Sequence, residues 1–211
     1  MAFRGFTDET FAFYEGLLAD NTKSYWTAHK DAYERYVREP LAELCAELED
    51  EFGPAKLFRP YRDVRFAADK TPYKTHQGAH SRRGLYVQID ADGLMVAGGL
   101  YAPEPDQLRR YRAAVDADST GKELEALVEA LRASGMEIAG DRLKTRPRGT
   151  RADHPRLDLL RHRSLYAREG WPADPWMATH EAVERVRASW RRLLPLARWS
   201  EEHIGPPGFA R

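Results

Sequence analysis

The sequence has little of several features that would define a protein's chemistry. It contains one cysteine, Cys45, so it cannot form an internal disulfide, which is typical of a reducing compartment. No run approaches the roughly 18 apolar residues of a membrane-spanning helix, and the first residues lack the apolar region of an export signal. We therefore expect a cytoplasmic protein that does not enter a membrane.

The common fingerprints of nucleotide and hydrolase sites are also missing. There is no Gly-x-Gly-x-x-Gly, no P-loop and no Gly-x-Ser-x-Gly. His76 and His80 have the spacing that a helix would need for a shared metal ion, but Gly78 lies between them and no acid stands nearby at the right place. Cys45 lies among leucines and is expected in the core. The sequence therefore predicts neither a metal site nor a cofactor.

The length and the composition are those of one globular domain. The chain has 211 residues, of which 42% are apolar and 31% charged, a balance that excludes a disordered chain. We expect residues 1–205 to form a single domain and the Gly- and Pro-rich residues 206–211 to be a frayed tail. No pattern indicates an oligomeric state.

The order of the predicted elements defines the fold class. Helices are expected over residues 8–19, 25–37 and 40–52, and the alternating residues 85–89 followed by Asp92-Gly93 predict a β-hairpin through residue 101. Further helices are expected at 106–115, from a capping box at Thr120, and after Asp174-Pro175 as far as Pro195, with short strands at 136–138, 143–145 and 164–168. This order predicts an α+β protein, with a central, mostly antiparallel sheet flanked by N- and C-terminal helices.

The charge is balanced overall and divided locally. The chain has 33 basic and 33 acidic residues, yet residues 56–83 hold eight Lys and Arg against two Asp, and residues 141–168 hold nine against three. The rest of the chain then carries a net charge of −12. Two cationic runs in an anionic body favour a local anion site over a surface that binds polyanions as a whole.

The first cationic run contains the most informative stretch, residues 58–75, which we name the central segment. If residues 62–66 are extended, Asp63 and Arg65 share one face and can pair, while Arg62 points among apolar neighbours and needs an internal carboxylate or a bound anion. Asp69 then begins a turn and accepts backbone N–H bonds. As a site, this stretch would bind an anion through Arg62, Arg65, Lys70 and Lys74, with Asp63 or Asp69 as general base and Tyr73 as hydrogen-bond donor.

The second cationic run contains residues 143–150, which we name the Lys144 loop. Pro147 and Gly149 predict irregular backbone, and Lys144, Arg146 and Arg148 can donate to phosphate or carboxylate. The alternative is a solvated basic loop. A shared anion pocket requires that this loop and the central segment converge in space.

Several blocks together resemble a known family. They are Phe3-x-x-Phe6, Asn21-x-Lys23-x-x-Trp26, the run from Arg62 to Thr75, and Leu143-Lys144-x-x-Pro147-Arg148-Gly149 with the following Asp153-His154-Pro155. They are similar to a bacterial and fungal conserved-hypothetical family, catalogued as domain of unknown function 2461. The resemblance covers nearly the whole chain and implies no established activity.

Three function classes are compatible with these patterns. The first is a site, binding or catalytic, for a phosphorylated or carboxylated small ligand. The second is a nucleic-acid-associated module, which zero net charge disfavours. The third is a protein-interaction domain in which the Arg and Asp side chains are only structural. The sequence does not decide whether the protein is an enzyme.

Overall fold

The computed structural model describes residues 2–65 and 68–206, which form two compact units. The first unit contains residues up to Ser81, with Tyr86–Val96 and Gly170–Ala188. The second contains Arg82–Leu85, Ala97–Glu169 and the chain from Ser189. Pro206, the one described residue of the predicted tail, accepts a hydrogen bond from the Gln107 amide (2.8 Å). That residues 1–205 form a single domain stays a prediction.

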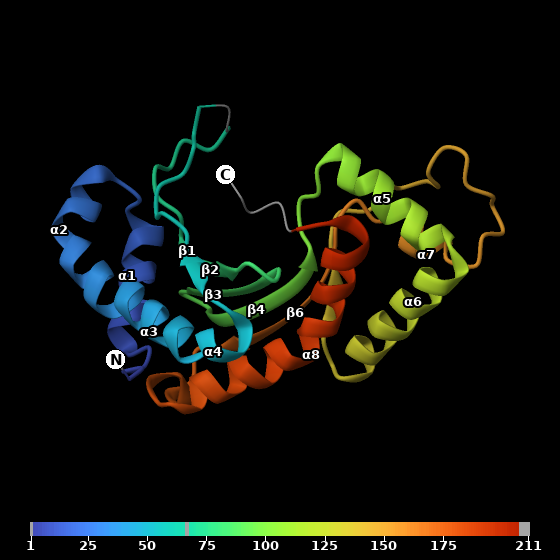
Figure 1. The fold of residues 1–211 in the computed structure, drawn as a ribbon. Coiled ribbons are helices and arrows are strands. Elements are labelled where there is room, and N and C mark those ends of the chain that lie inside the picture. Colours follow the sequence, from blue (N-terminus) through green and yellow to red (C-terminus); the bar gives the residue numbers. More distant parts are fainter. Residues whose placement is uncertain (1, 66–67, 207–211) are drawn as a thin grey trace. The chain divides into compact units, whose positions relative to one another are not determined.

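The strands form one six-stranded antiparallel sheet in the order β1-β2-β3-β4-β6-β5 (Figure 1). Their bounds are β1 Ala55–Leu57, β2 His76–Ser81, β3 Leu85–Asp90, β4 Gly93–Leu100, β5 Glu137–Ala139 and β6 Leu165–Pro172. The hairpin of β3 and β4 follows the predicted alternation and turn. The α+β prediction is therefore confirmed.

The bounds of the helices are α1 Asp8–Ala19, α2 Lys23–Tyr33, a π-helical turn Glu34–Arg38, α3 Glu39–Glu47, α4 Glu49–Phe52, α5 Pro105–Asp116, α6 Asp118–Ala133, α7 Leu157–Leu160, a 3₁₀ turn Pro175–Ala178 and α8 Glu181–Ile204. Helices α1 to α4 precede the strands and α8 follows them, while α5, α6 and α7 lie between β4 and β6 in the sequence. Among the described residues, no helix combines the length and the apolar composition that a bilayer crossing requires.

Two details of the helix prediction were wrong. Pro195 lies inside α8 and does not end it. The flanking side chains Leu193 and Leu196 are fully buried, so tertiary packing outweighs the missing N–H of one proline. Thr120 is not the N-cap of α6, because the helix begins two residues earlier and the Thr120 hydroxyl donates to the carbonyl of Ala114.

In the first unit, a π-helical turn joins α2 to α3 where Pro40 follows. Proline has no N–H, so it cannot donate to the carbonyl of Tyr36 four residues earlier. That carbonyl accepts instead the fully buried hydroxyl of Thr10 on α1, at 2.6 Å. The irregular turn thus anchors α1 to the helices that follow it.

The core of the first unit is aromatic. Trp26 lies 4.8 Å from Tyr33 and 6.0 Å from Phe13, ring centroid to ring centroid, and all three side chains are buried. The Tyr33 hydroxyl donates to Gln77 on β2, whose amide in turn donates to the carbonyl of Phe58 (2.8 Å). These contacts join the N-terminal helices to β2 and to the start of the central segment.

Candidate functional site

The central segment folds back on itself as a hairpin, with its two arms side by side in Figure 1. Tyr61 and Tyr73 form an antiparallel bridge. The Arg62 N–H donates to the carbonyl of Pro72 (2.9 Å), and the Lys74 N–H donates to the carbonyl of Pro60 (2.8 Å). The second arm leads directly into β2, so the last residues of the hairpin lie beside the sheet.

The helices of the first unit hold the base of this hairpin. The Asn21 side-chain amide donates to the carbonyl of Tyr73 (3.0 Å), and its oxygen accepts from the Tyr73 N–H (3.1 Å). One side chain thus satisfies both backbone groups of Tyr73, as a neighbouring strand would. The Trp26 ring stacks on the Tyr73 ring at 4.4 Å, with 6° between the planes. The Asn21 to Trp26 block and the central segment therefore form one structural unit.

The charged side chains of the central segment pair mostly with one another. Arg65 makes two hydrogen bonds to the carboxylate of Asp63 (2.9 and 2.7 Å). Arg62 pairs with Asp69 and also donates to the Thr71 hydroxyl. The predicted pairing of Asp63 with Arg65 and the predicted Asp69 turn, in which the Thr71 N–H donates to Asp69 (2.9 Å), are confirmed. The prediction that Arg62 points among apolar neighbours involves Phe66, which lies outside the described residues.

These contacts decide the protonation of the two carboxylates. Hydrogen bonds from Arg65 lower the pKa of Asp63 to about 2. The Thr71 N–H and the Arg62 guanidinium lower the pKa of Asp69 to about 2. A general base works best with a pKa near the working pH, so carboxylates this acidic are weak bases at neutral pH. The geometry favours a structural role for both, and their catalytic role stays a prediction.

Acid is expected to open this hairpin before the rest of the protein unfolds. Both carboxylates have a lower pKa in the folded chain than the ordinary value of 3.8, so their stabilising effect is present above that value and is lost as the pH falls through about 2. Amide hydrogen exchange from pH 4.5 to pH 2 measures the opening at Thr71. Asp69→Asn should make this amide exchange fast already at pH 4.5, and unchanged protection in that variant would contradict the assignment.

Lys74 differs from the other cations of the central segment. It is half-buried and its ammonium lies 5.1 Å from the centroid of the Phe58 ring. Burial lowers the pKa of Lys74, and the neighbouring Arg59 lowers it further. Among the described residues, no carboxylate lies within ion-pair distance of Lys74 or of Arg59. By contrast, the Lys70 ammonium is 3.0 Å from the carbonyl of Val64.

Lys74 leads onto a half-buried polar face that sequence reasoning missed. Side chains on β2 and β3 alternate between faces, and the register pairs His76 with Asp90, Gly78 with Gln88 and His80 with Tyr86. We name these residues, together with Lys74, the polar face of β2–β3. The alternation of β3 was a usable signal, but β2 contains small and polar residues and carries no strand pattern of its own.

Hydrogen bonds connect the side chains of β3 on this face. The Tyr86 hydroxyl donates to the side-chain oxygen Oε1 of Gln88, and the side-chain Nε2 of Gln88 donates to the Asp90 carboxylate, both at 2.8 Å. Asp90 also accepts the N–H groups of Asp92 and Gly93 in the following turn. A β-carbon on Gly78 would lie 2.3 Å from the Tyr86 hydroxyl oxygen, so the phenol occupies space that only glycine leaves.

The Lys144 loop belongs to the second unit and is held by its backbone. Arg161 donates to the carbonyls of Leu143 and Lys144, both at 2.9 Å. The side chains of Lys144, Arg146 and Arg148 are exposed, and within the described ranges none of the three has an ion-pair partner. The central segment lies in the first unit, so the convergence of the two cationic runs stays a prediction.

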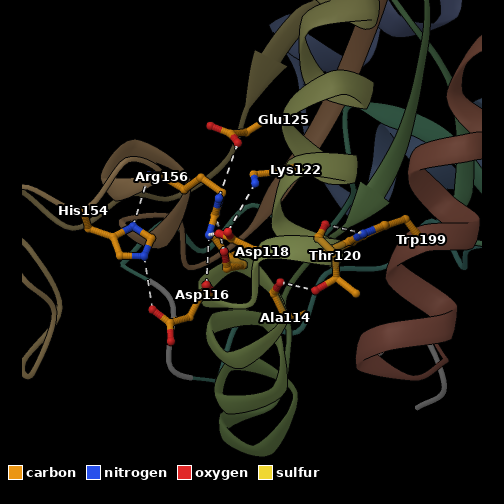
Figure 2. A network of polar contacts seen from close by, with 10 residues as sticks. Ala114, Asp116, Asp118, Thr120, Lys122, Glu125, His154, Arg156 and Trp199 are labelled. Carbon is orange, nitrogen blue, oxygen red and sulfur yellow. Dashed lines mark hydrogen bonds and ion pairs between the residues drawn. The ribbon is translucent and has the colours of Figure 1, made fainter.

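Beyond this loop, a buried arginine fixes the chain to α5 and α6 (Figure 2). Arg156 donates to the carbonyls of Val115 (2.7 Å) and Asp116 (2.9 Å) at the end of α5, and to the carboxylate of Asp118 (2.8 Å) at the start of α6. A β-carbon on Gly121 would lie 2.5 Å from the Arg156 Nε atom, so this glycine leaves the space for the guanidinium. No sequence pattern distinguishes Arg156, the buried arginine, from the other eight cations of its run.

His154 completes this network without a free ring nitrogen. Its Nδ1 atom accepts the N–H of Arg156 at 3.1 Å, so the proton of the neutral ring is on Nε2. Nε2 lies 3.1 Å from the Asp116 carboxylate. The block Asp153-His154-Pro155 of the family pattern therefore holds the chain in place here rather than offering a catalytic imidazole.

The predicted site residues thus divide into three groups. Within the hairpin, Arg62 pairs with Asp69, Arg65 pairs with Asp63, and Lys70 contacts the carbonyl of Val64. Tyr73 is buried under Trp26 at the hairpin base, and burial raises the pKa of its phenol. Lys74 and the three cations of the Lys144 loop keep their charges unpaired within the described ranges. No group of three or more His, Cys, Asp or Glu in those ranges is arranged to hold a metal ion.

The fold defines the class: an α+β protein with one six-stranded antiparallel sheet. A family model described as a conserved hypothetical protein (DUF2461) matches residues 9–199. The chain belongs to this family, as the resemblance of its motifs predicted. No curated protein and no solved structure matches the chain.

Proposed function

We propose that the protein binds a small phosphorylated or carboxylated ligand at the base of the central segment, with Lys74 as the main contact to the anion. The single observation behind this is the state of Lys74: half-buried, close enough to Arg59 for its pKa to be lowered, and without a carboxylate in ion-pair distance among the described residues. A charge kept in such a place is unfavourable unless an anion compensates it.

The other cations of the hairpin are less available to a ligand than Lys74, which supports this location. Arg62 and Arg65 are each engaged by a carboxylate of the same hairpin, so a ligand would have to displace an existing ion pair to use them. Lys74 and Arg59 offer their charges without that cost. Two like charges close together also produce a local positive potential that attracts anions.

Removing the charge of Lys74 is expected to weaken this binding. Wild-type protein should melt at a higher temperature with inorganic phosphate or with a panel of small carboxylates, because a ligand that binds only the folded state stabilises it. Lys74→Met keeps the apolar stem on Phe58 and removes the ammonium. We expect its dissociation constant, measured by calorimetry, to rise at least about tenfold, the loss of one charge-assisted hydrogen bond.

A matched control separates this effect from general stabilisation by salt. Phosphate stabilises most folded proteins at high concentration by exclusion from their surface. Lys30→Met removes an exposed lysine of α2 in the same unit and should leave phosphate binding unchanged. An equal rise in melting temperature for wild type and Lys74→Met, or none in wild type, would refute the proposal.

A second candidate function is a protein-interaction element, which the internal pairing of the hairpin favours. Arg62, Arg65 and Lys70 already have partners within the segment, so these side chains need no ligand, and Tyr61 is 48% exposed. Calorimetry with inorganic phosphate distinguishes the two candidates. An interaction element with a purely structural ion-pair network predicts no saturable phosphate binding by wild type, whereas the anion site predicts saturable binding that Lys74→Met weakens.

A further inference from the structure

The polar face of β2–β3 contains a second group that has no partner. His76 is half-buried, and no hydrogen bond to its ring occurs among the described residues. Burial lowers its pKa, Lys74 lowers it further, and Asp90 acts in the opposite direction. The ring is therefore neutral at pH 7 and has one nitrogen that can accept a hydrogen bond.

The remaining groups of this face are already fixed. Asp90, Gln88 and Tyr86 form one hydrogen-bonded chain, and the turn after β3 holds its Asp90 end. The Phe58 ring lies 5.1 Å from the His80 ring and 6.1 Å from the Tyr86 ring and covers the far end. What the face leaves unsatisfied is one cation, Lys74, and one acceptor, His76.

These two groups are neighbours along the chain. Lys74 precedes β2 by two residues and His76 is the first residue of β2. Two residues of extended chain span about 6.6 Å. The Lys74 ammonium lies over the Phe58 ring, and this ring contacts His80 and Tyr86. Lys74 therefore reaches the face on which His76 is the first residue of β2. A ligand that satisfies both needs an anionic group and a hydrogen-bond donor a few bonds apart.

Resting on the proposed function, we infer that the polar face of β2–β3 selects small hydroxylated anions: the carboxylate or phosphate lies on Lys74 and a hydroxyl donates to the ring of His76. Simple anions bind through Lys74 alone. The hydroxyl adds one hydrogen bond to a neutral partner, which corresponds to a preference of about threefold to tenfold.

Matched ligand pairs test this preference with the full-length protein. Lactate is compared with propionate, and glycerol 3-phosphate with propyl phosphate, by calorimetry at pH 7.5. We expect the hydroxylated member of each pair to bind about threefold to tenfold more tightly. In His76→Phe the members of each pair should bind equally, whereas His29→Gln, a change at an exposed histidine of α2, should keep the preference.

The preference should also depend on pH in a characteristic direction. Protonated His76 cannot accept from a hydroxyl, so the ratio within each pair, corrected for the ionised fraction of each ligand, should fall as the pH drops below the ordinary histidine value of 6.5. Lys74, Asp90 and the neighbouring His80, whose pKa burial also lowers, are the charged or titratable groups nearby, and all four ligands share their effect.

The outcomes separate this inference from the proposed function. Equal binding within both pairs in wild type overturns the selection by His76 and leaves the anion site at Lys74 intact. Failure of all four ligands to bind overturns the anion site itself. If His76→Phe does not fold, the ring nitrogen resonances of His76 in wild type decide: lactate should shift them more than propionate, and equal shifts overturn the inference.

Discussion

Arg156→Ala is expected to destabilise the protein by about 3 to 5 kcal/mol, one of the two largest effects in the molecule. The Arg156 side chain is 3% exposed and its guanidinium binds two carbonyls at the end of α5. Alanine would leave these carbonyls without their donor and open a cavity beside Gly121. Asp118 is 72% exposed, so solvent screens that ion pair and the carbonyls carry most of the effect.

Urea denaturation followed by circular dichroism measures this change, and the chain provides a matched control. Arg151 lies in the same stretch, pairs with Asp153 and is 79% exposed, so Arg151→Ala should cost less than about 1 kcal/mol. Arg156→Lys should recover only part of the loss, because an ammonium does not reproduce the geometry of a guanidinium. Equal stability of Arg156→Ala and Arg151→Ala would contradict the role assigned to the network in Figure 2.

Trp26→Ala is expected to have an effect of similar size, about 3 to 5 kcal/mol. Trp26 is 5% exposed, packs against Phe13 and Tyr33 in the core, and stacks on Tyr73 at the hairpin base. Its removal leaves a large cavity and frees Tyr73 on one side. Phosphate binding should also weaken, because Lys74 directly follows the residue that Trp26 holds.

The measurements for this variant are the free energy of unfolding and the phosphate affinity of the folded fraction. Trp176 is the comparison: it lies in the same unit, is only half-buried, and carries the guanidinium of Arg185 at 4.3 Å from its ring centroid. Trp176→Ala should lose less than half as much stability and keep phosphate binding. A Trp26→Ala protein that binds phosphate as tightly as wild type would contradict the claim that the hairpin base positions the anion site.

Sequence patterns correctly predicted the contacts between residues that lie close together in the sequence. The pairing of Asp63 with Arg65 spans two residues and the turn at Asp69 also spans two. The β3–β4 hairpin follows from alternation and from an Asp-Gly turn. In each case the interacting groups lie within a few residues, so spacing alone restricts which contacts are possible.

The contacts that hold the candidate site were not predictable because they join distant residues. Asn21 and Tyr73 are 52 residues apart, and Arg156 and Val115 are 41 apart. Burial also comes from packing: on the same helix α1, Leu18 is 58% exposed while Phe13 is 4% exposed. β2 was missed because glycine, histidine and glutamine carry little strand propensity and their burial depends on β3.

The most direct test of the central claim is a titration of the isotopically labelled protein with inorganic phosphate at constant ionic strength, followed by two-dimensional amide NMR. A phosphate site at Lys74 predicts saturable shifts that are largest around Arg59 and residues 73–77 and that disappear in Lys74→Met. Shifts that do not saturate, or that gather only at the Lys144 loop, would contradict it.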